Sequence, residues 1–184
     1  VKDGRWCTRP ISELQKALGS RFRMLGWLRD GKRRDDLTAS SPLLADDILL
    51  TNGLDFSPDG KLLASGGADK AVRITDLTNG KVVKVFEGHT HHVLGLSWRA
   101  DGRLLASSGA DNVVKVWDWT TGDRRKSVDG WDKEVTGIRY LGAADQIATS
   151  AGDAKLRLIT SDGGEVKQLP GATTFLQSLA TTQT

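Results

Sequence analysis

The sequence predicts an all-β fold of short antiparallel strands, because residues of several kinds return along the chain at one fixed interval. Aspartates, glycines, alanines and aromatic residues each recur 42 positions apart. The series are Asp69, Asp111 and Asp153; Gly53, Gly95 and Gly137; Ala64, Ala106 and Ala148; and Phe56, Trp98 and Tyr140. Within each copy the apolar residues alternate or form brief runs, which favours strands over helices. These observations together indicate a tandem all-β repeat.

The first copy shows how one repeat is built. Its apolar runs lie at residues 54–56, 62–64, 72–74 and 82–85, and turn-forming residues separate them. In Ser57-Pro58-Asp59-Gly60, proline presets the first turn dihedral and glycine accepts a positive one, so the chain reverses there. Four hairpin-linked strands in a period in the low forties predict a partial β-propeller of four-stranded antiparallel blades.

The middle copy carries the motifs of a known family. It opens with Gly88-His89 and closes its third strand with Trp117-Asp118, and it resembles a WD-repeat blade of a β-propeller. The flanking copies depart from this pattern, with Thr75-Asp76 and Ile159-Thr160 in place of Trp-Asp, and Asp46-Asp47 and Gly130-Trp131 in place of Gly-His. The segments SPDG (57–60) and LLASGGAD (62–69) resemble those of bacterial members of the family.

The resemblance covers residues 46–184 and predicts the domain organisation. Blades are expected at 46–87, 88–129 and 130–171, followed by an incomplete one at 172–184. Residues 1–45 are expected to form an N-terminal basic helical arm and a linker. Apolar residues of this arm recur at threes and fours, behind a candidate capping box of Ser12 and Gln15. They are Ile11, Leu14, Leu18, Phe22, Leu25 and Leu28.

The charge of the chain gathers in this arm. Residues 1–37 hold ten Lys and Arg against five Asp and Glu, a net +5, whereas the rest holds 16 against 18, a net −2. A basic amphipathic helix can contact a membrane surface or a nucleic acid. However, Asp30, Asp35 and Asp36 dilute the basic run, and aromatic platforms for stacking bases are few. The sequence therefore favours a helix that covers an open propeller edge over a nucleic-acid or membrane partner.

One set of residues in the middle copy carries candidate chemistry: His89, Ser107, Asp111 and Trp117. A hydroxyl, an imidazole and a carboxylate are the parts of a nucleophilic triad, so a hydrolase is one hypothesis. The resemblance instead implies a structural tetrad that braces the blade through buried hydrogen bonds. The sequence shows no nucleophile elbow or oxyanion hole, so we expect no catalytic residue and no enzyme activity.

The tetrad leads to a ranking of the three repeated aspartates. The outer copies keep the hydroxyl and the carboxylate, Ser65 with Asp69 and Thr149 with Asp153, without the histidine and tryptophan. The sequence therefore predicts that Asp111→Ala destabilises the fold more than alanine at either of the other two positions.

The clustered histidines are a candidate metal site, since imidazoles bind zinc and copper. His89, His91 and His92 are the three histidines of the chain, and one of them is assigned to the tetrad. The single cysteine, Cys7, lies outside the repeats and excludes both an internal disulfide and a Cys-x-x-Cys-His haem attachment within the chain. We expect no metal and no cofactor.

The resemblance places the candidate partner-binding residues in loops on the propeller rim. They are His91, His92, Asp132, Lys133 and Glu134. Mixed charge in these loops indicates polar recognition of a protein partner rather than an obligate apolar interface. The sequence thus predicts a non-catalytic protein-binding scaffold.

The end of the pattern adds an alternative. A fourth copy begins at Gln177 and stops at Thr184, before its first turn. Unpaired blade edges favour self-association or a fragment of a longer protein. The alternative function is a structural module of a larger multidomain bacterial protein, in one version exported and adjoining a c-type haem or another enzymatic domain. The chain contains no signal peptide pattern, and the sequence leaves the compartment open between cytoplasmic and exported.

Overall fold

A computed structural model describes residues 53–142, 144–169, 173, 174 and 176, together with the backbone of three earlier strands. The chain divides into two compact units, Val1–Asn52 and Gly53–Thr184. No helix among the described residues is long and apolar enough to cross a membrane.

The first unit contains a small antiparallel sheet. Its strands are β1 (Met24–Arg29), β2 (Lys32–Arg34) and β3 (Ile48–Thr51), in the order β2-β1-β3. The prediction of a helix is wrong at Leu25 and Leu28, because both lie in β1. Gly26 costs a helix about 1 kcal/mol relative to alanine, and here it lies beside an irregularity in the β1–β3 pairing.

The remaining predicted helix positions, the capping box and the linker at 38–45 lie outside the described residues. The predicted blade boundaries therefore stay predictions. In the described part, the first blade strand begins at Leu54, and β3 pairs with β1.

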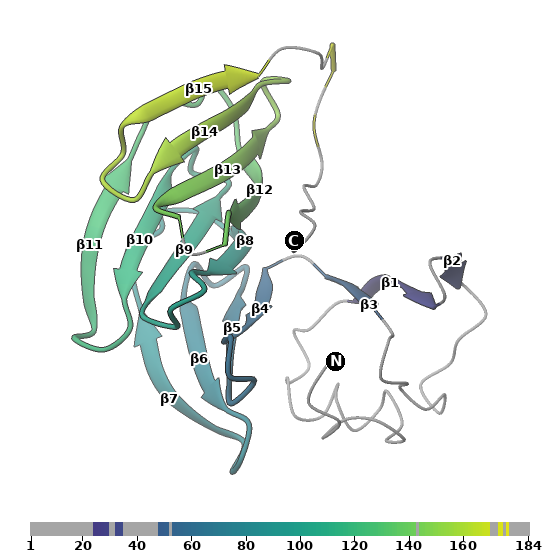
Figure 1. Cartoon of the computed structure of the whole chain (residues 1–184), viewed down its shortest axis with the longest axis vertical. Helices are drawn as coiled ribbons and strands as arrows, with labels where there is room; N and C mark the ends of the chain where they lie inside the picture. Colours follow the sequence, from purple (N-terminus) through teal and green to yellow (C-terminus); the bar gives the residue numbers. More distant parts are fainter. Residues whose placement is uncertain are drawn as a thin grey trace. The chain divides into compact units, whose positions relative to one another are not determined.

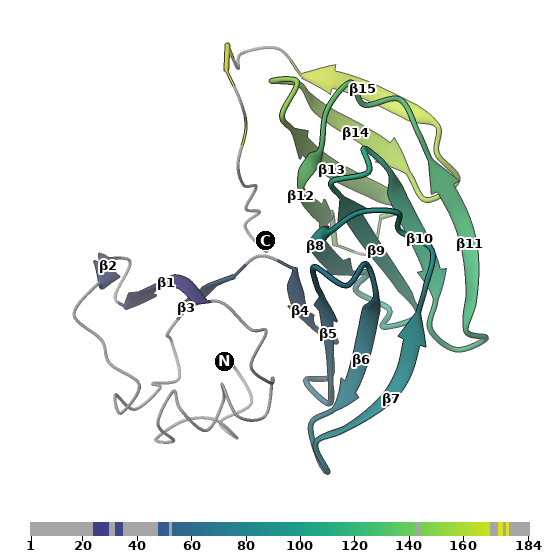
Figure 2. The same cartoon turned by 180° about the vertical axis from the view of Figure 1, so that it is seen from behind.

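The second unit consists of three antiparallel four-stranded sheets, each built from consecutive strands (Figures 1 and 2). Blade 1 comprises β4 (Leu54–Phe56), β5 (Leu62–Gly66), β6 (Val72–Asp76) and β7 (Lys81–Phe86). Blade 2 comprises β8 (Val93–Trp98), β9 (Leu104–Gly109), β10 (Val114–Asp118) and β11 (Asp123–Val128). Blade 3 comprises β12 (Val135–Tyr140), β13 (Gln146–Ala151), β14 (Leu156–Thr160) and β15 (Glu165–Leu169). The predicted tandem of four-stranded antiparallel sheets is confirmed.

The turns form where the sequence places them. Gly60 has φ +68° and donates its N–H to the Ser57 carbonyl oxygen at 2.8 Å, which closes the first hairpin. Gly80 has φ +71° and donates to the Asp76 carbonyl oxygen at 2.8 Å. Positive φ favours glycine at both positions, because a Cβ atom would clash with the backbone there.

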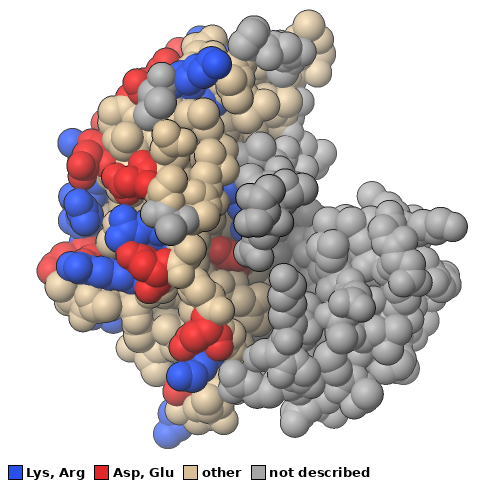
Figure 3. Space-filling view, in the orientation of Figure 1, with Lys and Arg blue, Asp and Glu red and all other residues tan. Residues whose placement is uncertain are grey.

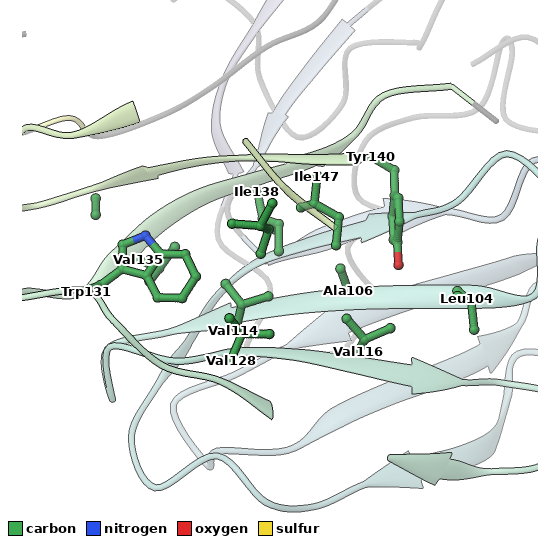
Figure 4. Packing of buried hydrophobic residues seen from close by; sticks show 12 residues of the cluster. Leu104, Ala106, Val114, Val116, Val128, Trp131, Val135, Ile138, Tyr140 and Ile147 are labelled. Carbon is green, nitrogen blue, oxygen red and sulfur yellow. The ribbon is translucent and has the colours of Figure 1, made fainter. Parts of the chain in front are cut away.

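The core lies between successive blades. Figure 4 shows Val114 and Val116 of blade 2 facing Ile138 and Ile147 of blade 3. A second cluster joins blades 1 and 2, in which Phe86 stacks on Trp117 with 5.0 Å between ring centroids. The apolar residues of the inner strands thus bury one face against a neighbouring blade, as their alternation predicts, whereas Val82, Val83 and Val85 of the outer strand β7 are exposed.

The inner strands β4 and β8 bind the next blade through a repeated hydrogen bond. Asp55 Oδ2 accepts the backbone N–H of Trp98 at 2.6 Å, and Ser97 Oγ accepts the N–H of Tyr140 at 3.0 Å. At the third equivalent position Arg139 reaches back, and its Nη1 lies 3.3 Å from Asp55 Oδ1. Burial raises the pKa of Asp55, against the opposing effects of Arg139 and the Trp98 N–H.

The inner glycine position is crowded, as the sequence indicates. A Cβ atom on Gly95 would lie 3.0 Å from Cγ2 of Ile138 in the next blade and 2.7 Å from the Oγ of Ser108. Glycine at this position therefore permits blades 2 and 3 to approach each other closely.

The equivalent aromatic residues differ in burial. Trp98 and Tyr140 are each 5% exposed, whereas Phe56 is 36% exposed. A preceding blade covers the first two, and no described blade precedes blade 1. Phe56 is therefore the one of these three aromatic residues that no described blade covers.

Candidate functional site

The structure brings together all four members of the predicted tetrad in blade 2. His89 precedes β8, Ser107 lies on β9, Asp111 lies in the following turn and Trp117 lies on β10. His89 Nδ1 lies 2.9 Å from Asp111 Oδ2, and His89 Nε2 lies 2.8 Å from Ser107 Oγ. Trp117 Nε1 donates to the same Ser107 Oγ at 2.8 Å.

The order of these bonds is that of a Ser-His-Asp triad, but their burial differs from that of a working nucleophile. Ser107 is 0% exposed and Trp117 is 2% exposed. If the carboxylate of Asp111 fixes the proton on His89 Nδ1, Nε2 accepts the Ser107 hydroxyl proton, and the indole N–H of Trp117 binds the Ser107 oxygen. The Ser107 hydroxyl is therefore hydrogen-bonded to both His89 and Trp117, and its burial keeps a substrate from reaching it.

The electrostatics of the cluster follow from this burial. Desolvation lowers the pKa of His89, against the attraction of Asp111, so the imidazole is neutral at pH 7. Burial alone would raise the pKa of Asp111, but the Thr90 N–H, at 2.9 Å from Oδ2, and His89 outweigh it and lower the pKa. An ionised carboxylate thus holds a neutral histidine.

Blade 3 has a different cluster at the same positions, which the sequence reasoning missed. Arg157 Nη2 lies 2.7 Å from Asp153 Oδ2, and its Nη1 lies 3.3 Å from Oδ1. The two side chains are 6% and 5% exposed. The guanidinium also lies over Trp131, 5.7 Å from the ring centroid. Trp131 occupies the position of His89, so the available signal was a Trp-for-His exchange together with an arginine four residues after the aspartate.

Blade 1 has an open version of the blade 3 pair. Arg73 Nη2 lies 2.6 Å from Asp69 Oδ2, and the two side chains are 36% and 25% exposed. In blade 2 the equivalent residue is Lys115, whose Nζ donates to Ser127 Oγ at 3.1 Å. Burial lowers the pKa of Lys115.

The predicted rim residues lie in two equivalent loops. His91 and His92 belong to the β7–β8 loop, are exposed, and have ring centroids 4.5 Å apart. Asp132, Lys133 and Glu134 belong to the β11–β12 loop, where the first two are exposed and Glu134 is half-buried.

Backbone hydrogen bonds fix both loops to the turn that follows in the same blade. The His92 carbonyl oxygen accepts from Ala110 N at 2.8 Å, and the Glu134 carbonyl oxygen accepts from Gly152 N at 2.9 Å. Each loop thus presents its side chains from an anchored backbone.

The charged surface is mixed. In Figure 3, basic and acidic side chains intersperse over the described part of the visible face. Asp132 of the β11–β12 loop forms a salt bridge with Lys155, whose Nζ lies 3.2 Å from Asp132 Oδ2. Among the residues described, no three His, Cys, Asp or Glu side chains are grouped to hold a metal ion. Cys7 lies outside the described residues.

Comparison with known families matches two stretches of the chain. The family described as WD domain, G-beta repeat, matches residues 80–118, and the anaphase-promoting complex subunit 4 WD40 domain matches residues 45–93. Residues 45–118 are therefore similar to WD-repeat family models. The WD-repeat motif Trp117-Asp118 lies at the end of the first match, in the blade that holds the tetrad.

A curated relative supports the same WD-repeat assignment. The general transcriptional corepressor TUP1 of Saccharomyces cerevisiae is 41% identical over 59 residues, which are 32% of this chain and 8% of that protein. This relative is a yeast protein, and the expectation of a bacterial type finds no support in the comparisons.

Two similar solved structures carry the titles "Structure of U3-55K" and "Crystal structure of RRP9 WD40 repeats". Each is 20% identical with a TM-score of 0.65, and the match covers 68% of this chain and 40% of the other. This likeness shows the shared WD-repeat propeller fold.

Proposed function

We propose that the chain is a non-catalytic protein-binding scaffold, a segment of a WD-repeat propeller that presents rim loops to a protein partner. The observation that carries this proposal is the contrast in burial within blade 2. The reactive groups of His89 and Ser107 are enclosed and bonded to each other, whereas His91 and His92 are exposed on an anchored loop.

The chemistry of the rim favours a polar partner surface. The two loops between them offer imidazole, ammonium and carboxylate groups, most of them exposed. Such groups contribute to specificity and to the association rate more than to affinity. We therefore expect a reversible interface that weakens as salt concentration rises.

The test is affinity capture with a two-residue variant, His92→Ala/Glu134→Ala, which changes both loops. The matched control is Thr78→Ala/Thr121→Ala, because these exposed residues lie in the turns at the opposite ends of β7 and β11. Loss of the partner with the first variant and retention with the second supports the proposal. Equal binding by both variants would move the interface off this rim.

The hydrolase hypothesis has its own test. The purified chain and its Ser107→Ala variant are compared for hydrolysis of an activated ester. Equal background rates support the non-catalytic assignment, and turnover that disappears with Ser107 would overturn it.

Self-association through open blade faces is a second proposal, favoured by the exposure of Phe56. Light scattering should show a larger species that dissociates in Phe56→Glu and persists in Lys81→Glu. A monomeric wild-type chain would contradict it.

The alternative of a module in a larger multidomain protein, exported or not, remains a proposal. The chain spans 8% of the yeast relative and 40% of each similar structure. Gene sequence on either side that encodes further repeats or a Cys-x-x-Cys-His segment would support this alternative.

A further inference from the structure

The outer strand of blade 2 contains a basic run that ends in a serine, Arg124-Arg125-Lys126-Ser127. It is the one place in the sequence where arginines stand both two and three residues before a serine or threonine. Protein kinases select substrates through charge patterns, and an acidic groove selects arginines at these positions. We propose that Ser127 is a phosphorylation site for a protein kinase with an acidic substrate groove.

The strand offers the run in an extended form, with its three basic residues exposed. β11 is the edge strand of its sheet, paired with β10 on one side, and no described strand pairs with its other side. Residues 123–126 are exposed and Ser127 is half-buried. The β10–β11 register shifts at Arg125, which lies between the pairs Trp117↔Arg124 and Val116↔Lys126. Edge strands with interrupted pairing are open to an incoming chain.

The surroundings of the Ser127 hydroxyl would stabilise a phosphoserine at this position. Lys115 Nζ lies 3.1 Å from Ser127 Oγ. A phosphate at this oxygen would lie against an ammonium that has no carboxylate partner within salt-bridge distance among the described residues, and it would form charge-assisted hydrogen bonds.

The flanking blades lack this arrangement. Arg73 faces Val85 across its sheet, and Arg157 faces Gln168. Both arginines are also paired with an aspartate of their own blade. A hydroxyl beside a cation that forms no salt bridge among the described residues therefore occurs in blade 2 alone among these three equivalent pairs.

The transfer needs a nucleoside triphosphate and the kinase as co-reactants. Ser127 Oγ forms a bond to the γ-phosphorus, the bond from that phosphorus to the β–γ bridging oxygen breaks, and the nucleoside diphosphate leaves with the electron pair. The hydroxyl proton passes to the catalytic carboxylate of the kinase.

The test incubates the whole chain with the catalytic subunit of cAMP-dependent protein kinase, magnesium and ATP, followed by intact mass and fragment analysis. We expect one phosphate at Ser127 and none in Ser127→Val, a change that copies Val85 of blade 1. In Arg124→Ala/Arg125→Ala the initial rate should fall at least about tenfold, because the recognition charges are lost. The charge-matched control Lys81→Ala/Lys84→Ala on β7 should keep the wild-type rate. Absence of phosphate in wild type, undiminished phosphate in Ser127→Val, or an unchanged rate in the arginine variant would overturn the proposal.

A second measurement tests the role of Lys115. The phosphorylated chain should melt at a higher temperature than the unmodified chain, and this shift should disappear in Lys115→Met. A lower melting temperature after phosphorylation would overturn the pairing of the phosphate with Lys115.

Discussion

Blades 2 and 3 hold the aspartate of their second turn with different partners. In blade 2, Asp111 is hydrogen-bonded to Nδ1 of the neutral His89 ring, and Nε2 of the same ring is hydrogen-bonded to Ser107. In blade 3, Asp153 receives two bonds from the guanidinium of Arg157, which also stacks on an indole. In these two blades the carboxylate thus has a buried donor, which is a histidine from before the blade in blade 2 and an arginine from the third strand in blade 3.

The two solutions differ in where the charge lies. In the blade 2 cluster only the Asp111 carboxylate is charged, and its hydrogen-bond partner His89 is neutral. In the blade 3 cluster both the Asp153 carboxylate and the Arg157 guanidinium are charged and buried. Loss of one member of a buried ion pair leaves the other uncompensated, which costs more than loss of a neutral hydrogen bond. The comparison therefore predicts unequal responses to equivalent substitutions.

The largest effect is expected for Asp153→Ala. This change leaves the buried guanidinium of Arg157 without its carboxylate, so the free energy of unfolding measured in urea should fall by about 3–5 kcal/mol. The sequence predicted the largest loss of stability for Asp111→Ala, because it identified no partner for Asp153. The pairing of Asp153 with Arg157 reverses that order. The double variant Asp153→Ala/Arg157→Met should recover part of the loss, and no recovery would argue against a stranded charge.

Asp111→Ala should cost less, about 1–3 kcal/mol, because the group left without its acceptor is a neutral imidazole. The matched control is Asp69→Ala in blade 1, whose pair with Arg73 is partly exposed and should contribute at most about 1 kcal/mol. Urea titrations of the three alanine variants give the order directly. Equal losses would remove the distinction between the clusters.

Acid should weaken blade 2 through His89. Burial lowers its pKa below the ordinary value of 6.5, so the unfolded state binds more protons than the folded state. Stability is therefore present above about pH 6.5 and is lost as pH falls toward the lowered value. Between about pH 7.5 and about pH 5.5, wild type should lose more stability than His89→Gln. Parallel curves for the two proteins would show that His89 does not cause the dependence.

The smallest effect concerns the turn beside each aspartate. Lys70, Asn112 and Ala154 are equivalent and have φ of 69°, 62° and 63°. Asparagine tolerates this left-handed conformation better than alanine, so Ala154→Asn should stabilise the chain by about 0.5–1 kcal/mol. The reciprocal Asn112→Ala should destabilise it similarly. Thermal melts check both, and a loss in Ala154→Asn would contradict the assignment of strain.

Much of the blade architecture could be predicted, because period, turn residues and alternation all follow from local sequence. The turn at Gly60 and the meeting of His89 with Asp111 are examples. Arg157 could not be assigned, because its partner depends on which side chain fills the space left by the missing histidine. The helix prediction failed at Leu25 and Leu28 for another reason, because pairing of β1 with β2 and β3 outweighs a spacing of threes and fours that is typical of a helix.

The inner strands give the blades a direction. At positions 55 and 97 the side chain accepts the backbone N–H of the blade that follows, whereas at position 139 the arginine has no acceptor to offer. The three repeats are therefore not interchangeable modules, even though their strands superpose in sequence. Exchanging blade 1 for blade 3 would place an arginine side chain, which can only donate, against the backbone N–H of Trp98, so the hydrogen bond that Asp55 now accepts would be lost.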